Sequence, residues 1–301
     1  LNNGYGDQVN FFLYVNQTDP DGTMTWFHNQ LLDAERAGDK VHIVAHIPAG
    51  SGESLEEWSL NYYRVVNRFE DTITAQFMGH THSEEFNMYY ENMDDASSRP
   101  TSVSYSAPSL TTYSEYYPAY RIYNIEGNYA GSQFRVIDWS EYYVDLTEAN
   151  ASPAKDPEWK TLYASVLDEY KLKDVSPSEW SQFIENMITD DDLFNKYRKN
   201  FYRRNMDTTC DWACRRGFLC SARRSHKSDA ICSDIPLSPP TGKGKKADRS
   251  TSHSVKRISK RRKTIAKVEK KPTKDEVISK ARQIVRKNML KRNRADTQCK
   301  L

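Results

Sequence analysis

Long hydrophobic segments are absent from this sequence, and cysteine is scarce. No run of apolar residues approaches the about 20 that a membrane-spanning helix requires. The chain begins at Leu1 in a polar stretch, without a methionine and without a recognisable signal peptide. We therefore expect an amino-terminal part to be missing, so the lack of a signal peptide excludes no cellular destination. The length of 301 residues allows one large domain or two smaller ones.

The five cysteines argue for disulfide bonds rather than for a structural zinc site. Four lie close together, at Cys210, Cys214, Cys220 and Cys232, and Cys299 stands apart. Structural zinc sites usually carry two Cys-x2-Cys pairs, whereas the first pair here is spaced Cys-x3-Cys and the later gaps are wider. We expect sequence neighbours to bond, Cys210 with Cys214 and Cys220 with Cys232. Such bonds indicate an oxidising compartment.

Two Asn-x-Ser/Thr triplets agree with that compartment. They begin at Asn16 and Asn150 and are acceptors for N-glycosylation, although such triplets also arise by chance. Together with the cysteines they predict a secreted, extracellular or lysosomal protein.

Charge divides the chain into two parts. Residues 1–235 carry 21 basic and 36 acidic side chains, a net of −15, and residues 236–301 carry 22 and 5, a net of +17. Within this tail, residues 256–263 form a basic block and residues 272–293 fit an amphipathic helix. We expect the tail to be mostly solvated and disordered. The alternative is binding to an anionic membrane surface. Nucleic acid is not an expected partner, since disulfides and glycosylation contradict a nuclear location.

Hydrophobic periodicity predicts an α/β sheet in the first 80 residues. Strands are expected at residues 9–16, 41–45 and 72–79, and helices at residues 23–37 and 55–69. Strands that alternate with helices are typical of a sheet covered by helices.

The pattern changes after His82. Residues 85–90, 103–107, 120–126 and 133–146 fit strands separated by polar turns, which predicts an antiparallel meander at one side of the sheet. Helical spacing returns from Trp159 and predicts further helices at residues 177–187 and 190–201. Ser176, with Glu179 three residues further on, fits the N-cap of the helix at 177–187.

Three histidines are candidate metal ligands. His46 ends one predicted strand, and His80 and His82 follow another. Chemistry in such a sheet collects at the carboxyl ends of strands, and neutral imidazole is the commonest metal ligand in proteins. His80 and His82 would point the same way from an extended stretch, and Gly79 lets the backbone turn tightly. The three rings could bind one metal or divide between two.

The alternative is that these histidines are ordinary core or surface side chains, which is the usual case for a single histidine on an apolar strand. His42, inside a valine-rich strand, is read in that way, and His28, His226 and His253 have no ligand-like neighbours. The paired Gly-His-x-His and the strand-end His-x-Pro favour metal binding by the other three.

Several segments resemble the second half of the acid sphingomyelinases, a secreted and lysosomal group of calcineurin-like metallophosphoesterases. They are residues 38–48 (GDKVHIVAHIP), 58–64 (WSLNYYR), 75–82 (AQFMGHTH) and 111–113 (TTY), with the Cys-x3-Cys-x5-Cys pattern further on. The resemblance extends over about residues 1–234 and does not include the tail after Pro236.

The resemblance implies an enzyme that uses two zinc ions to split sphingomyelin into ceramide and phosphocholine. It assigns His46 and His80 to one zinc and His82 to the other, and it places Tyr113 near the substrate pocket. The family's Asp-x-His, Gly-Asp and Gly-Asn-His motifs, which supply the other ligands and the acid, are not found before His46, and its saposin-like domain is absent too. Because three neutral imidazoles offset no metal charge, we expect the chain alone to bind metal weakly and to be inactive.

The expected fold is therefore an incomplete metallophosphoesterase sheet sandwich. Residues 1–148 would form the second half of the catalytic domain, residues 149–235 a small disulfide-bonded helical subdomain, and residues 236–301 the basic tail. Three functions stay open. The first is the carboxyl-terminal part of a phosphodiesterase that acts on sphingomyelin in membranes or lipoproteins. The second is a related enzyme for nucleotides or other phosphate esters, and the third is a non-catalytic protein that binds membranes through the tail.

Overall fold

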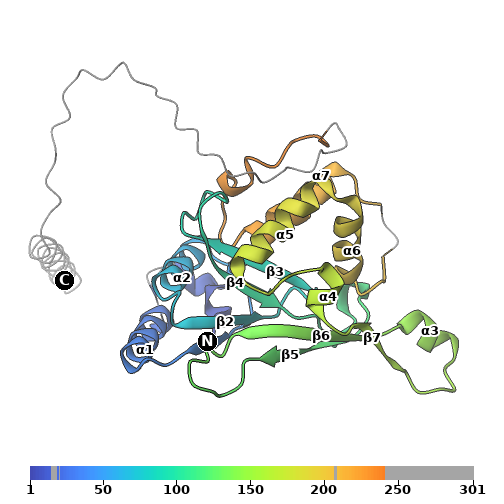
Figure 1. Cartoon of the computed structure of the whole chain (residues 1–301), viewed down its shortest axis with the longest axis horizontal. Coiled ribbons are helices and arrows are strands. Elements are labelled where there is room, and N and C mark those ends of the chain that lie inside the picture. Colours follow the sequence, from blue (N-terminus) through green and yellow to red (C-terminus); the bar gives the residue numbers. More distant parts are fainter. Residues whose placement is uncertain (15–18, 20, 207–208, 241–301) are drawn as a thin grey trace, which may run out of the picture. The chain divides into compact units, whose positions relative to one another are not determined.

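Two β-sheets form the frame of the chain (Figure 1). The computed structural model describes residues 1–14, 19, 21–206 and 209–240, so the tail at 241–301 with its predicted helix at 272–293 lies outside the described residues. The first sheet contains β1 (Val41–Val44), β2 (Ile73–Met78), β4 (Pro100–Ser106) and β3 (Glu85–Tyr90), in that order. The second contains β5 (Ala119–Ile125), β6 (Val136–Val144) and β7 (Trp159–Tyr163).

Helices of the described residues precede, connect and follow these strands. The α-helices are α1 (Thr23–Ala37), α2 (Glu56–Arg68), α3 (Leu146–Ala151), α4 (Val166–Tyr170), α5 (Pro177–Thr189), α6 (Asp191–Phe201) and α7 (Trp212–Arg223). Short 3-10 turns occupy Gly4–Gly6, Phe11–Tyr14, Tyr113–Glu115 and Ala230–Cys232. The mixed α/β class predicted from the sequence is confirmed.

β1, α2 and β2 form a parallel β–α–β unit, and the candidate histidines follow the ends of its two strands. α1 ends at Gly38, whose φ of 76° is readily adopted only by glycine, and β1 begins three residues later. β1 pairs with β2 in parallel, with Val44 opposite Phe77. The carboxyl ends of the two strands therefore lie at the same edge of the sheet.

The predicted antiparallel meander is wrong in its connectivity. β4 lies between β2 and β3, parallel to β2 and antiparallel to β3. β5 and β6 leave this sheet altogether and pair in the second one. Strand-like residue patterns define the strands but not their neighbours, because pairing depends on contacts between distant segments.

Two cores lie on opposite faces of the first sheet. Along β3, Tyr89 belongs to the core formed with α1 and α2, whereas Phe86, Met88 and Tyr90 belong to the core shared with the second sheet. Alternate residues of a strand point to opposite faces, so β3 separates the two cores. Figure 1 shows α5, α6 and α7 grouped beside β3 and β4, and Trp180 of α5 packs against Phe86 at a ring distance of 4.3 Å.

Two further local predictions are wrong. Trp159–Tyr163 forms strand β7 rather than the start of a helix, because it completes the edge of β6, and Tyr163 accepts a hydrogen bond from Trp139 Nε1 at 3.0 Å. Phe11–Tyr14 forms a 3-10 turn rather than a strand. The preceding backbone is bonded to a loop instead of a sheet, since the Gln8 N–H donates to Glu53 O at 2.8 Å.

A buried polar cluster joins the two sheets. Glu84, which precedes β3, accepts hydrogen bonds from the hydroxyls of Tyr163 (2.8 Å) and Tyr170 (3.0 Å). Arg121 of β5 donates to Glu141 of β6 at 2.9 Å, and its guanidinium lies 4.0 Å from Glu84. Burial, together with the charge of Glu141, raises the pKa of Glu84 to about 8. One buried cation thus faces two carboxyl groups, and the raised pKa of Glu84 favours its protonated form.

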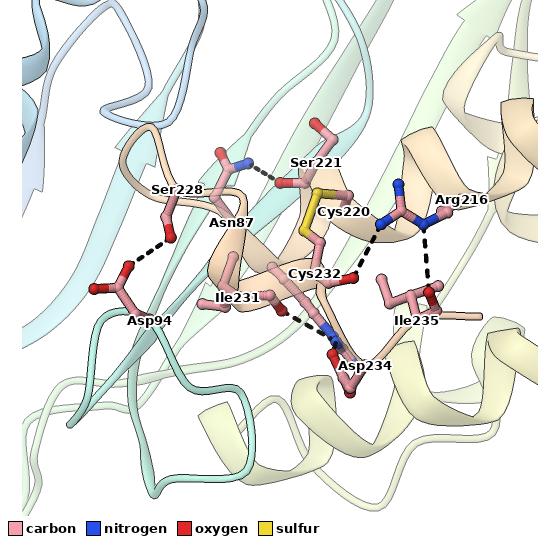
Figure 2. The surroundings of a disulfide bond; sticks show 11 residues. Asn87, Asp94, Arg216, Cys220, Ser221, Ser228, Ile231, Cys232, Asp234 and Ile235 are labelled. Carbon is pink, nitrogen blue, oxygen red and sulfur yellow. Dashed lines mark hydrogen bonds and ion pairs between the residues drawn. A yellow bond between two sulfur atoms is a disulfide. The ribbon is translucent and has the colours of Figure 1, made fainter. Parts of the chain in front are cut away.

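Disulfides hold the carboxyl-terminal segment in place. Cys210 is bonded to Cys214 and Cys220 to Cys232, in the pairing predicted from the sequence. Figure 2 shows the second bond, with Asn87 of β3 donating to the carbonyl of Ser221 at 2.9 Å nearby. This hydrogen bond and the disulfide attach α7 to both the first sheet and the last described turn.

β7 lies in the predicted second domain, after residue 149, but it pairs with β6, which lies in the predicted first domain. The division of the chain at residues 148 and 149 stays a prediction.

Candidate metal centre

The carboxyl ends of β1 and β2 bring His46 and His80 into contact. Parallel pairing continues past the strands, since the Gly79 N–H donates to the carbonyl of His46 at 2.9 Å. His46 Nε2 and His80 Nδ1 lie 3.2 Å apart, and the two rings are nearly perpendicular with centroids separated by 5.0 Å. Two imidazoles from different strands therefore meet at one point of the sheet edge.

His82 lies on an irregular turn rather than on an extended segment. His80 and His82 have positive φ values of 70° and 62°, a conformation that is uncommon for residues with a β-carbon. The expectation that both rings leave an extended stretch on the same side is therefore wrong. The ring of His82 packs edge-on against Tyr113, with centroids 5.8 Å apart.

Asn3 fixes the loop that carries His46. Its side-chain oxygen accepts hydrogen bonds from the N–H groups of His46 (3.0 Å) and Ile47 (3.1 Å), and its amide nitrogen donates to the Ile47 carbonyl at 2.5 Å. The Asn3 side chain is buried, so these bonds are shielded from water. Nothing in the local sequence pattern around Asn3 signals this role, because its partners lie more than forty positions away.

Glu53 is a second contact that sequence reasoning missed. One of its carboxylate oxygens lies 2.5 Å from His80 Nε2. Both ring nitrogens of His80 thus have a neighbour, His46 on one side and Glu53 on the other. The Gly/Ser-rich loop directly after His46 was the available signal for an acidic group here, since a loop at a strand end commonly lines a site.

The electrostatic environment favours neutral His46. Burial lowers its pKa, and positive charge on His80 and His82 lowers it further. The neutral imidazole has a free nitrogen lone pair and is the form that binds metals.

Arg203 connects the His82 segment to the end of α6. The guanidinium is buried and donates from Nη1 to the carbonyl of His82 at 2.7 Å and from Nε to the carbonyl of Tyr117 at 2.9 Å. It also stacks over the ring of Tyr116 at 4.3 Å. Arg203 thus joins the His82 turn to the loop that presents Tyr113.

The donor types suit zinc, but the described residues do not form a complete site. Imidazole nitrogens and carboxylate oxygens are usual zinc ligands. In residues 1–240, apart from the few not described, no group of three or more His, Cys, Asp or Glu side chains is arranged to hold a metal ion. His46, His80 and Glu53 are in contact in pairs, and His82 lies beside Tyr113.

Tyr113 borders His82, and the structure also places other positions predicted from the sequence. Tyr113 is 72% exposed, at the start of a 3-10 turn. Asn150 is exposed near the end of α3, which leaves it accessible for glycosylation, and Asn16 lies outside the described residues. His42, read as structural, bonds through Nε2 to the carbonyl of Phe134 at 2.6 Å. None of the helices in the described part of the chain combines the length and apolar character that a membrane crossing needs.

Comparison with known proteins finds similarity to a group of phosphodiesterases. The family model for the acid sphingomyelin phosphodiesterase C-terminal region matches residues 97–232. That segment contains Tyr113 and the four bonded cysteines, and the three candidate histidines precede it.

Curated relatives extend the match beyond this region. Sphingomyelin phosphodiesterase 1 of Caenorhabditis elegans is 41% identical over 234 residues, which are 77% of this chain and 40% of that protein. Sphingomyelin phosphodiesterase of Bos taurus is 41% identical over 235 residues, 77% of this chain and 36% of that protein. The human acid sphingomyelinase-like phosphodiesterase 3b is 27% identical over 228 residues, 70% of this chain and 48% of that protein.

The resemblance to acid sphingomyelinases predicted from the sequence is confirmed by these matches. The chain spans about two fifths of the length of the first relatives, between 36% and 40%.

Proposed function

We propose that this chain is the carboxyl-terminal part of a sphingomyelin phosphodiesterase, a phosphoric diester hydrolase that releases ceramide and phosphocholine. The observation that carries the proposal is the contact of His46 with His80 at adjoining strand ends, in a chain 41% identical to sphingomyelin phosphodiesterases. The two sheets would then belong to a metallophosphoesterase sandwich, and the part of the longer relatives that this chain does not span would supply the remaining ligands.

In the complete enzyme, His46 and His80 would hold one zinc ion and His82 the other. Bound zinc would lower the pKa of a water molecule and neutralise charge on the phosphate oxygens. Glu53, next to His80 Nε2, would orient that ring and add the negative charge that imidazoles lack. Asn3 would hold the backbone of His46, and Arg203 would hold that of His82. Tyr113, exposed beside His82, would contact the substrate.

The names of the relatives guide the choice of substrate. The proteins named sphingomyelin phosphodiesterase match at 41% identity, and the acid sphingomyelinase-like phosphodiesterase matches at 27%. Sphingomyelin is therefore the substrate that we propose, ahead of nucleotides or other phosphate esters. The two disulfides support a location in the secretory pathway, outside the cell or in lysosomes. The membrane-binding role of residues 236–301 stays a prediction.

Isothermal titration calorimetry of the purified chain with zinc tests the ligand assignment. We expect weak binding that His46→Ala, His80→Ala and His82→Ala each reduce at least several-fold, while His28→Ala, an exposed histidine on α1, leaves it unchanged. Equal binding in all four variants would refute the assignment.

Activity measurements test the reaction. The chain alone should not hydrolyse sphingomyelin, because its imidazoles cannot offset the charge of two zinc ions. When it is joined to the remaining part of the enzyme, it should hydrolyse sphingomyelin in preference to nucleoside triphosphates. Turnover by the chain alone, or a preference for nucleotides in the complete protein, would contradict the proposal.

A further inference from the structure

An apolar cavity lies between β3, α6 and α7, in a part of the fold that the proposed reaction does not use. Its volume is about 280 Å³, below the range of about 300 to 1,000 Å³ that is usual for drug-sized ligands. Aromatic rings contribute much of its lining, from Phe86 of β3, Tyr197 and Phe201 of α6, and Phe218 of α7. A small ligand with apolar surface fits such a space.

The aromatic rings around the cavity pack against one another. Phe201 and Phe218 have centroids 5.0 Å apart at an interplanar angle of 82°, and Phe86 and Tyr197 are 5.9 Å apart at 70°. Tyr197 and Phe218 complete the set at 6.4 Å and 87°. Rings from three elements are thus held in place by mutual edge-to-face contacts, and their faces carry the negative side of the ring quadrupole.

Glu85 is the only charged residue among those that line this cavity. Burial raises the pKa of its carboxyl group to about 7, against the opposing effects of a hydrogen bond with Thr81 and the charge of His80. A carboxylate among aromatic rings is poorly solvated, so a cation that enters the cavity would stabilise it.

Gly217 keeps the cavity open from the side of α7. It lies inside the helix, where alanine would be favoured because glycine loses more backbone entropy. A β-carbon built at this position has no atom within 4 Å outside its own helix. The backbone therefore permits a side chain here, and the sequence leaves the space empty.

We propose that this cavity is a binding site for an organic ammonium ion, whose charge pairs with Glu85 and whose methyl groups contact the rings of Phe86, Phe201 and Phe218. Aromatic faces with a nearby carboxylate are the arrangement that recognises quaternary ammonium groups. Such an ion could be a free quaternary ammonium compound or the headgroup of a lipid, and both present the same trimethylammonium group.

Binding of tetramethylammonium to the full chain, measured by saturation-transfer NMR and calorimetry without metal or substrate, tests the proposal independently of the enzymatic function. tert-Butanol, which is similar in shape and uncharged, is the matched ligand. We expect tetramethylammonium to bind at least about tenfold more tightly than tert-butanol. Glu85→Gln should remove this difference, and Glu57→Gln, an exposed position on α2, should keep it.

Gly217→Leu tests the location, because leucine would occupy part of the cavity from a position where a β-carbon meets no atom within 4 Å outside its helix. It should abolish binding, whereas Gly217→Ala should keep most of it, and thermal unfolding of both variants verifies that they fold. A soluble short-chain phosphatidylcholine distinguishes the sources. Tighter binding than tetramethylammonium assigns a lipid headgroup, and equal or weaker binding assigns a free quaternary ammonium compound. Absence of binding, or binding that survives both Glu85→Gln and Gly217→Leu, would overturn the proposal.

Discussion

Arg203 provides a quantitative test of how the fold holds the His82 turn. Its guanidinium donates to three backbone carbonyls, those of Tyr117, His82 and Phe201, at distances from 2.7 to 3.2 Å. Arg203→Met keeps an unbranched side chain of similar reach and removes all three donors. A buried carbonyl left without a donor costs about 1 to 3 kcal/mol.

Part of that cost is offset. Burial lowers the pKa of Arg203, so the charged guanidinium is itself poorly solvated in the folded state, and its Nη2 has no hydrogen-bond partner. Removing the cation recovers some of this unfavourable free energy. We therefore expect Arg203→Met to lower the free energy of unfolding by about 3 kcal/mol, the low end of the sum for three carbonyls at about 1 to 3 kcal/mol each.

Arg204 is the matched control, because it is the next residue and shares the positive φ conformation, 68° against 48° for Arg203. It is exposed and donates one hydrogen bond, to the carbonyl of Leu162 at 2.9 Å. Arg204→Met should cost no more than about 1 kcal/mol. Urea unfolding measures both variants, and the NMR signals of the His82 ring should shift only in Arg203→Met. Equal losses in the two variants would refute the assigned role.

Three other changes test separate features. Because the folded-state pKa of Glu84 is raised from 4.5 to about 8, its contribution to stability is complete below pH 4.5 and is lost as pH rises through 8. Glu84→Gln should therefore flatten the decline in the free energy of unfolding between about pH 5 and 8, measured by urea unfolding at each pH. An unchanged dependence on pH would contradict the raised pKa of Glu84. Replacing Cys220 and Cys232 by alanine opens a loop with a sequence separation of 12 and should cost about 3 kcal/mol in the same assay. Ser176→Ala removes the side chain that caps α5 and should lower stability by about 1 kcal/mol, whereas no change would contradict the capping assignment.

The helices show how far local patterns predict structure. Residues 23–37 form α1 with the predicted limits, and Gly38 ends the helix in a left-handed conformation. Ser176 caps α5 by accepting a hydrogen bond from the Glu179 N–H, as the capping-box pattern indicates. These features depend on residues three or four positions apart, so the local sequence contains the information that specifies them.

Features that depend on distant pairing were missed. Trp159–Tyr163 has helical spacing but forms β7, because the open edge of β6 provides a partner for its backbone. Nor does the sequence reveal that β5 and β6 leave the first sheet. Both outcomes are decided by which segments meet, and not by the preference of either segment alone.

The candidate centre shows the same division. The residue pattern was enough to locate His46 and His80 at strand ends, since hydrophobic runs and the following polar residues are adjacent in the chain. Only the tertiary structure revealed that Glu53 contacts the ring of His80. It also revealed that Asn3 accepts a hydrogen bond from the His46 N–H and that Arg203 donates one to the His82 carbonyl. The reason is physical: a ligand type is a property of one side chain, whereas its orientation, charge and support come from atoms that folding brings from 27, 43 and 121 residues away.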